Sequence, residues 1–192
     1  MPVSAPLPRP PGNAVVNLPN VISFARLCAV PAAVGLVLHQ AFAAAFWLFV
    51  AAGASDAVDG WLARRNGPTL VGTVLDPVAD KLLLVSMYVT LAAVHELPDW
   101  LAILVVFREV VILGGIMVLA ATGQKVTIRP VPISKLNTLL QIVLVALTLA
   151  QKGGLAATEW SGPMVTQVLG WAVAASTLAS GAAYVRIGAR AR

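Results

Sequence analysis

Four aspartates stand close together in an apolar part of this chain. They make up half of the eight acidic residues of the sequence, and they are Asp56, Asp59, Asp76 and Asp80. Carboxylates this close repel one another and lose hydration, so they must take up protons or hold cations. Carboxylate oxygens suit Mg²⁺ or Mn²⁺, and Mg²⁺ keeps coordination positions for water or substrate phosphates. The four aspartates therefore predict a divalent-metal site.

Small residues and an arginine accompany the aspartates. Gly60 and Gly72 have no side chain, so a ligand can approach the backbone closely at these positions. Ala63 adds another small residue, and the guanidinium of Arg64 is matched to phosphate oxygens. A close backbone, a metal and a guanidinium together describe a phosphate-transfer site.

Two other interpretations of the aspartates stay open. In one, the cluster is purely structural and the carboxylates pair with Arg64, Arg65 and Lys81. In the other, the chain is a cation transporter or channel, since intramembrane carboxylates also mark ion pathways. A transporter predicts charges spread through the depth of the bilayer, whereas a phosphate-transfer enzyme predicts them at one end.

The remaining sequence is apolar enough to hold these residues in a membrane. Of its 192 residues, 59% are hydrophobic and 11% charged, with a mean hydropathy of +0.87, whereas a soluble domain carries about 25% charged residues. Residues 1–16 are rich in proline and predict a disordered tail. Residues 17–192 are expected to form one all-α integral membrane domain with six transmembrane helices. The expected helices are at about 21–38, 41–63, 71–94, 98–121, 133–150 and 163–186.

The basic residues predict how the helices are oriented. All of them except Lys152 fall in the loops or nearest helix ends on the side that holds both termini. Positive charge favours the cytoplasmic face, so both termini and the aspartates are expected on the cytoplasmic side of a bacterial inner membrane. The net charge of +5 does not predict nucleic-acid binding, because the basic residues are spread along membrane borders.

The spacing of the acidic and small residues resembles a family signature. The pattern D-x-x-D-G-x-x-A-R, seven residues, G-x-x-x-D-x-x-x-D is met in full by Asp56, Asp59, Gly60, Ala63, Arg64, Gly72, Asp76 and Asp80. It resembles the signature of the CDP-alcohol phosphotransferases. The resemblance implies a six-helix membrane enzyme, usually a homodimer, that transfers a phosphate-linked lipid group from a CDP-activated donor to an alcohol and releases CMP.

The same resemblance implies a role for each signature residue. Asp56, Asp59 and Asp76 would bind the divalent ions, two Mg²⁺ or Mn²⁺, while Asp80 would contact a metal and act as general base. Arg64 would hold donor phosphate. The residues that would make room for the cytidine of the donor are Gly60, Ala63 and Gly72.

Similarity beyond the signature indicates which branch of the family the chain resembles more. Residues 17–150 resemble the CMP-forming cardiolipin synthases, and rather less the phosphatidylglycerophosphate synthases, in the stretches NLPNVISFARL, LDPVADK, FREVVILGGIMVL and PISKLNTLLQIVLVALTLA. Both branches imply CDP-diacylglycerol as donor. The first implies phosphatidylglycerol as acceptor, and the second implies glycerol 3-phosphate.

Four residues are candidates for binding the acceptor: Arg108, Arg129, Lys135 and Asn137. Arg108 and Glu109 interrupt an apolar run, where ionisable residues are functional by default, although a mutual or interhelical salt bridge is the open alternative. Arg129 alone is better explained as a loop charge facing anionic lipid. Asn137 stands where phosphatidylglycerophosphate synthases commonly carry a second lysine, and its neutral amide suits the hydroxyls of phosphatidylglycerol.

Overall fold

The computed structural model describes residues 18–66, 70–121, 132–155 and 162–190, without the side chains of residues 57–66 and 70–77 and of some residues at other helix ends. Within these ranges the chain forms six α-helices and no β-strand. They are α1 (Leu18–Leu38), α2 (Phe42–Asn66), α3 (Leu70–Ala93), α4 (Asp99–Ala121), α5 (Pro132–Lys152) and α6 (Pro163–Arg190). The predicted all-helical fold is confirmed, and the helix ends lie within a few residues of those expected.

The outer surface of the helices is strongly apolar. Ile103 and Phe107 on α4 are 67% and 64% exposed, and Met164 on α6 is 76% exposed. Among the described residues, the segment Ile133–Lys152, with a mean hydropathy of 1.7, is long and apolar enough to cross a membrane. Two shorter helical segments, Phe24–Leu38 and Phe42–Asp56, are also apolar.

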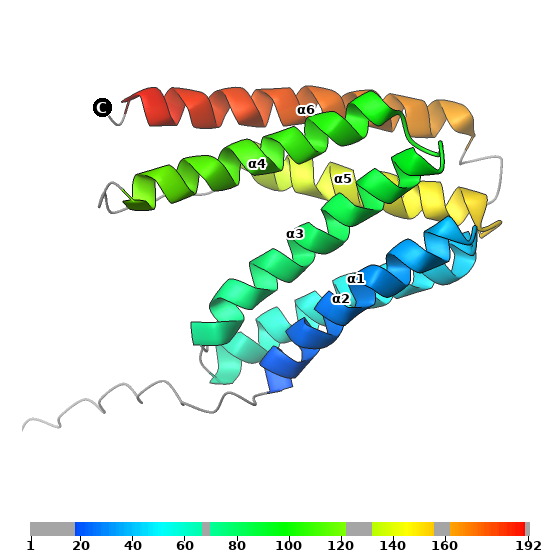
Figure 1. Cartoon of the computed structure of the whole chain (residues 1–192), viewed down its shortest axis with the longest axis horizontal. Coiled ribbons are helices and arrows are strands. Elements are labelled where there is room, and N and C mark those ends of the chain that lie inside the picture. The colour runs from blue at the N-terminus through cyan, green and yellow to red at the C-terminus, as the bar shows by residue number, and fades with distance from the viewer. Residues whose placement is uncertain (1–17, 67–69, 122–131, 156–161, 191–192) are drawn as a thin grey trace, which may run out of the picture.

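The helices form two groups that diverge at one end. α1 packs against α2 and α3, whereas α6 packs against α4 and α5. Contacts of α2 with α5 and of α3 with α4 join the two groups. In Figure 1, α4 and α6 run side by side at the top and α1 and α2 run obliquely below, so the groups separate toward the left, where α2 ends and α3 begins. We call this the open end, and the opposite end the closed end.

Three helices finish at the closed end in the same kind of tight turn. Gln40, His95 and Gly154, which follow α1, α3 and α5, have φ angles of 59°, 61° and 69°. After α1, for example, the Ala41 N–H donates to the Leu36 carbonyl at 2.8 Å. A left-handed residue followed by this long-reaching hydrogen bond is the Schellman motif, which satisfies the last carbonyls of a helix. The connections at the closed end are therefore short and well defined.

Two further contacts tie the closed end together. A side chain at Gly153 would meet the main-chain nitrogen of Ala43 at 2.7 Å, so the end of α5 packs directly on the start of α2. Lys152 Nζ lies 2.6 Å from Glu96 Oε2, which links α5 to the turn before α4. The core lies next to these turns, and its largest fully buried apolar side chains are Tyr88, Met87, Leu91, Leu101, Leu144 and Leu149.

Candidate active site

Asp56 on α2 and Asp80 on α3 are joined by a buried arginine of α1. Arg26 Nη1 lies 3.2 Å from Asp56 Oδ1 and 2.6 Å from Asp80 Oδ1. Arg26 Nε donates to Ser55 Oγ at 3.4 Å, and the Ser55 hydroxyl donates to the Ala52 carbonyl at 2.7 Å. The Arg26 side chain is 1% exposed, whereas those of Asp56 and Asp80 are 47% and 43% exposed. One guanidinium thus fixes two aspartates side by side and leaves them accessible.

The other signature residues are placed on the same two helices. α2 carries Asp59, Gly60, Ala63 and Arg64, and α3 carries Gly72 and Asp76, but their side chains lie outside the described ones. The roles expected for these six residues stay predictions. Among the described side chains, no three histidine, cysteine or acidic residues form a group that could hold a metal.

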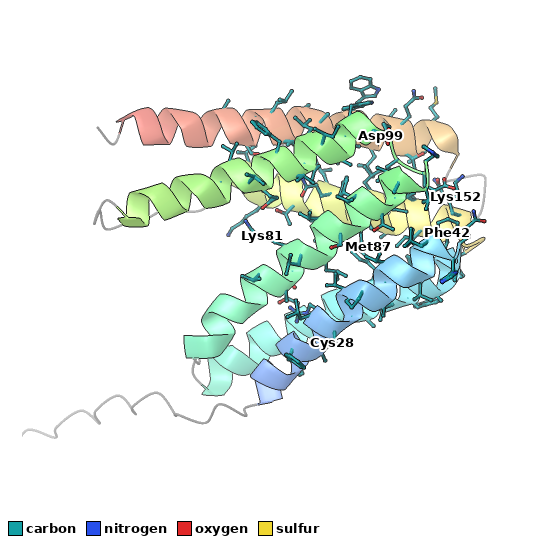
Figure 2. All side chains as sticks on the ribbon, in the orientation of Figure 1. Cys28, Phe42, Lys81, Met87, Asp99 and Lys152 are labelled. Carbon is teal, nitrogen blue, oxygen red and sulfur yellow. The ribbon has the colours of Figure 1, made fainter. Side chains whose placement is uncertain are left out.

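A second polar cluster lies between α3, α4, α5 and α6. Lys81 Nζ is 2.8 Å from Glu109 Oε2, and Glu109 Oε1 pairs with Arg108 Nη1. Figure 2 shows Lys81 extending from α3 toward α4. Arg108 also donates from Nη2 to Ser134 Oγ at 2.6 Å and from Nε to Ser180 Oγ at 3.3 Å. The mutual salt bridge of Arg108 and Glu109, the alternative to a role in binding, is therefore present. Lys81 pairs with Glu109 and not, among the described side chains, with an aspartate of the signature.

A cavity of about 660 Å³ connects the aspartate pair with this second cluster. The charged residues that line it are Asp56, Asp80, Lys81, Arg108 and Glu109. Most of the remaining lining is apolar and includes Phe49 on α2 and Leu84 on α3. Asp56 lies about two helical turns nearer the open end than Phe49, and Asp80 about one turn nearer than Leu84. The cavity is thus charged toward the open end and apolar toward the closed end.

The remaining candidates for acceptor binding lie in different surroundings. Lys135 is exposed in the first turn of α5, and Arg129 falls outside the described residues. Asn137 is fully buried against α6, where its Oδ1 accepts hydrogen bonds from the hydroxyls of Ser176 at 2.7 Å and Thr177 at 2.9 Å. Arg108 lines the cavity, whereas Asn137 is not among its described lining residues. The acceptor role of all four residues stays a prediction.

The sequence interpretation missed two residues of the site. Arg26 stands inside the first apolar run, so the criterion applied to Arg108, an ionisable residue within a span, also selects it. Gln141 lines the cavity and follows Asn137 by four positions, which places both on one face of α5. Nothing in the sequence indicated which of these two amides faces the cavity.

Comparison with known proteins identifies the family. The family described as CDP-alcohol phosphatidyltransferase matches residues 16–179, a range that includes Arg26 and the four aspartates. The chain belongs to the CDP-alcohol phosphatidyltransferase family. This match confirms the resemblance inferred from the eight signature positions. Arg26, Asp56 and Asp80 therefore lie within the matched CDP-alcohol phosphatidyltransferase region.

The curated relatives of this family member carry two activities in their names. A cardiolipin synthase (CMP-forming)/mitochondrial hydrolase fusion protein of Schizosaccharomyces pombe is 30% identical and aligns with 94% of this chain and 32% of its own length. A chloroplastic CDP-diacylglycerol–glycerol-3-phosphate 3-phosphatidyltransferase of Oryza sativa subsp. japonica is 33% identical over 88% of this chain and 56% of its own. Cardiolipin synthase (CMP-forming) of Rattus norvegicus is 28% identical over 90% and 61%. The chain therefore spans about a third to three fifths of the length of these relatives.

The described part of the CDP-alcohol phosphatidyltransferase site is chemically suited to a divalent cation. Asp56 and Asp80 supply hard carboxylate oxygens, which are the ligands that Mg²⁺ and Mn²⁺ prefer. Both carboxylates border the cavity and converge on one nitrogen of Arg26. The donor chemistry of these two carboxylates suits a divalent ion, and metal binding by the site stays a prediction.

Arg26→Lys is expected to lower kcat by about 10- to 100-fold, because the two aspartates lose their shared anchor and small misplacements of catalytic groups are costly. An ammonium is a compact point charge, and it cannot reproduce the planar set of donors that Arg26 directs to Ser55, Asp56 and Asp80. The measurement is steady-state release of CMP from CDP-diacylglycerol by purified protein in detergent.

Cys28→Ala provides the matched control, since Cys28 is exposed on the same helix. The positioning role predicts that the KM for CDP-diacylglycerol and the thermal unfolding temperature of Arg26→Lys change little compared with kcat. An Arg26→Lys enzyme with the kcat of the wild type would show that the guanidinium is not needed to hold the carboxylates.

Proposed function

We propose that this protein transfers a phosphatidyl group from CDP-diacylglycerol to the glycerol moiety of phosphatidylglycerol, which yields cardiolipin and CMP. The observation that carries the proposal is the cavity that joins Asp56 and Asp80 to the cluster of Lys81, Arg108 and Glu109. Family membership and the activities in the names of the relatives support it. The charged lining lies toward one end of the cavity, which favours an enzyme over a transporter.

The reaction needs a base beside the acceptor hydroxyl. The hydroxyl oxygen forms a new bond to the phosphorus that carries diacylglycerol, the bond from that phosphorus to the oxygen of CMP breaks, and CMP leaves with this oxygen. Asp80 accepts the proton of the hydroxyl, and its side chain is accessible from the cavity. Arg26 acts through Asp80 by holding its Oδ1.

The proposed enzyme depends on divalent cations. Asp56, Asp59, Asp76 and Asp80 would hold two Mg²⁺ or Mn²⁺ ions. Such ions polarise phosphoryl oxygens and stabilise a departing phosphate. In this proposal Arg64 binds the phosphates of the donor, while Gly60, Ala63 and Gly72 leave room for the cytidine, as the signature pattern predicts.

The cavity continues from its charged end into an apolar part, which suits the acyl chains of CDP-diacylglycerol and of a lipid acceptor such as phosphatidylglycerol. Leu84 and Ile142 line this part and can contact acyl chains. Arg108 is the proposed binding group for the acceptor phosphate, since it is a cation that lines the cavity. Lys135, Arg129 and Asn137 complete the proposed acceptor set.

The proposed setting of the enzyme is a bacterial inner membrane. Its six helices would cross the bilayer with both termini and the open end at the cytoplasmic face. Support comes from the apolar outer surface and from the gathering of charged residues at the open end. The functional unit is proposed to be a homodimer, as the resemblance implies.

Glycerol 3-phosphate is the second candidate acceptor, which the rice relative and the cations Lys81 and Arg108 favour. Purified protein with CDP-diacylglycerol is expected to form cardiolipin from phosphatidylglycerol at least about tenfold faster than it forms phosphatidylglycerophosphate from glycerol 3-phosphate, because a phosphate monoester requires more cationic partners than a phosphodiester. Each acceptor is supplied separately, and the lipid product is identified by mass spectrometry. Efficient phosphatidylglycerophosphate formation without cardiolipin would establish the second acceptor.

A further inference from the structure

The side chain of Gln141 is a buried amide without hydrogen-bond partners. Gln141 is 0% exposed on α5 and lines the cavity. Within the described part of the chain, neither its Oε1 nor its Nε2 has a hydrogen-bond partner. Buried polar groups are nearly always hydrogen-bonded, because water no longer satisfies them. Because Gln141 also lines the cavity, a ligand group that enters the cavity can supply the missing partner of this amide.

The position of Gln141 in the cavity is fixed from α3. The Tyr88 hydroxyl donates to the main-chain carbonyl of Gln141 at 3.3 Å. Tyr88 is itself fully buried, so the two helices are held together at this level. The main chain that carries the amide is thus held in place, as a selective binding group requires.

The surroundings of Gln141 favour a neutral ligand group. The neighbouring lining residues Ile142 and Ala146 on α5 and Leu84 on α3 are apolar, and Thr138 on α5 adds a neutral hydroxyl that donates to the Ser134 carbonyl. Ser134, the partner of Arg108, lies seven positions earlier on α5, or about 10 Å along the helix axis. A phosphate group of the substrate would lie beside the cations Arg108 and Lys81. Gln141 would then contact a neutral polar group that lies between this phosphate and the apolar part of the cavity.

A diacylglycerol lipid has a neutral polar group next to its phosphate, on the side of the acyl chains. Along the molecule, the phosphate is followed by the glycerol and by two ester carbonyls, beyond which the acyl chains are wholly apolar. We propose that Gln141 binds an ester carbonyl of the diacylglycerol substrate, with Nε2 donating the hydrogen bond. The proposal rests on the proposed function, and the same ester chemistry is present in CDP-diacylglycerol and in phosphatidylglycerol. The cavity then distinguishes ester-linked lipids from ether-linked lipids.

The test replaces the ester linkages of CDP-diacylglycerol by ether linkages, which removes the carbonyl oxygens and keeps the chains. Wild-type protein is expected to show a kcat/KM about five- to tenfold higher for the ester donor, the effect of one hydrogen bond. Gln141→Leu is expected to lose this preference. A second arm compares ester-linked and ether-linked phosphatidylglycerol with the ester donor, and the arm that shows the preference identifies which lipid Gln141 contacts.

Gln167→Leu is the matched control, because Gln167 is exposed on α6 and the same substitution there leaves the preference intact. Gln141→Leu is expected to fold, since an amide without partners is replaced by an apolar group of similar size. Gln141→Met is the second variant, and it is also expected to fold and to lose the preference for the ester-linked donor.

The outcomes separate this proposal from the proposed function. Equal kcat/KM for ester and ether lipids in both arms, or an ester preference that persists in Gln141→Leu, overturns the role of Gln141. Wild-type protein that consumes no CDP-diacylglycerol with either acceptor overturns the proposed function. In that case, the shift in thermal unfolding temperature produced by ester-linked against ether-linked CDP-lipid still decides whether Gln141 recognises the carbonyl.

Discussion

Asp80→Asn is expected to lower kcat by about 10²- to 10⁴-fold, the range that general-base catalysis supplies, while CDP-diacylglycerol still binds. The asparagine amide is nearly the same shape as the carboxylate but cannot take up the proton of the acceptor hydroxyl. Arg26 Nη1, now 2.6 Å from Asp80 Oδ1, can still donate to the amide oxygen, so the local structure is retained. The measurement is CMP release at saturating Mg²⁺ and Mn²⁺, together with equilibrium binding of the donor.

Asp99→Asn is the control for this substitution, because Asp99 lies at the start of α4 toward the closed end and asparagine is equally good at a helix N-terminus. Asp76→Asn is expected to differ from Asp80→Asn by weakening metal binding as well as transfer. A loss of less than tenfold for Asp80→Asn would contradict the assignment of Asp80 as general base.

Removal of divalent cations is expected to abolish transfer, and Mg²⁺ or Mn²⁺ should restore it. The expectation follows from four carboxylates within a short stretch of an apolar chain and from the opening of Asp56 and Asp80 into the cavity. CMP release is measured before and after treatment with excess chelator, and the metal content of the protein is determined by elemental analysis.

The control adds chelator that was saturated with Mg²⁺ beforehand, so any effect of the chelator on detergent or protein is seen separately. Full activity in excess free chelator, with no metal retained by the protein, would show that the aspartates serve another purpose. The structural alternative, in which the carboxylates only pair with basic residues, would then account for the contact between Arg26, Asp56 and Asp80.

The helices and their order could be predicted because each apolar run is bounded by turn and charge signals. The adjacency of Arg108 and Glu109 in the sequence indicates a mutual salt bridge as an alternative to acceptor binding, and this ion pair is present. The placement of Asp56 beside Asp80 followed from their positions near the ends of two consecutive helices, and the structure brings them to one guanidinium.

The contribution of α1 could not be predicted in the same way. Arg26 lies 30 positions from Asp56 and 54 from Asp80, and the sequence contains no local pattern that relates them. The faces of α1 differ little in hydrophobicity, so hydrophobic periodicity does not indicate which face points inward. The sequence did not separate Gln141, which lines the cavity, from Asn137, which packs against α6, because the two amides lie four positions apart on one face of α5.

The buried guanidinium of Arg26 has a consequence for biogenesis. During synthesis α1 leaves the ribosome before α2 and α3, and at that stage its arginine has neither of its carboxylate partners. An arginine at the centre of an isolated apolar helix costs about 2.5–3.5 kcal/mol on translocon-insertion scales, and less toward the lipid headgroups. In the proposed membrane setting, lipid alone holds the first helix poorly, and its stable integration requires the two helices that carry Asp56 and Asp80. Insertion of the N-terminal half would in this way be coupled to assembly of the carboxylate pair.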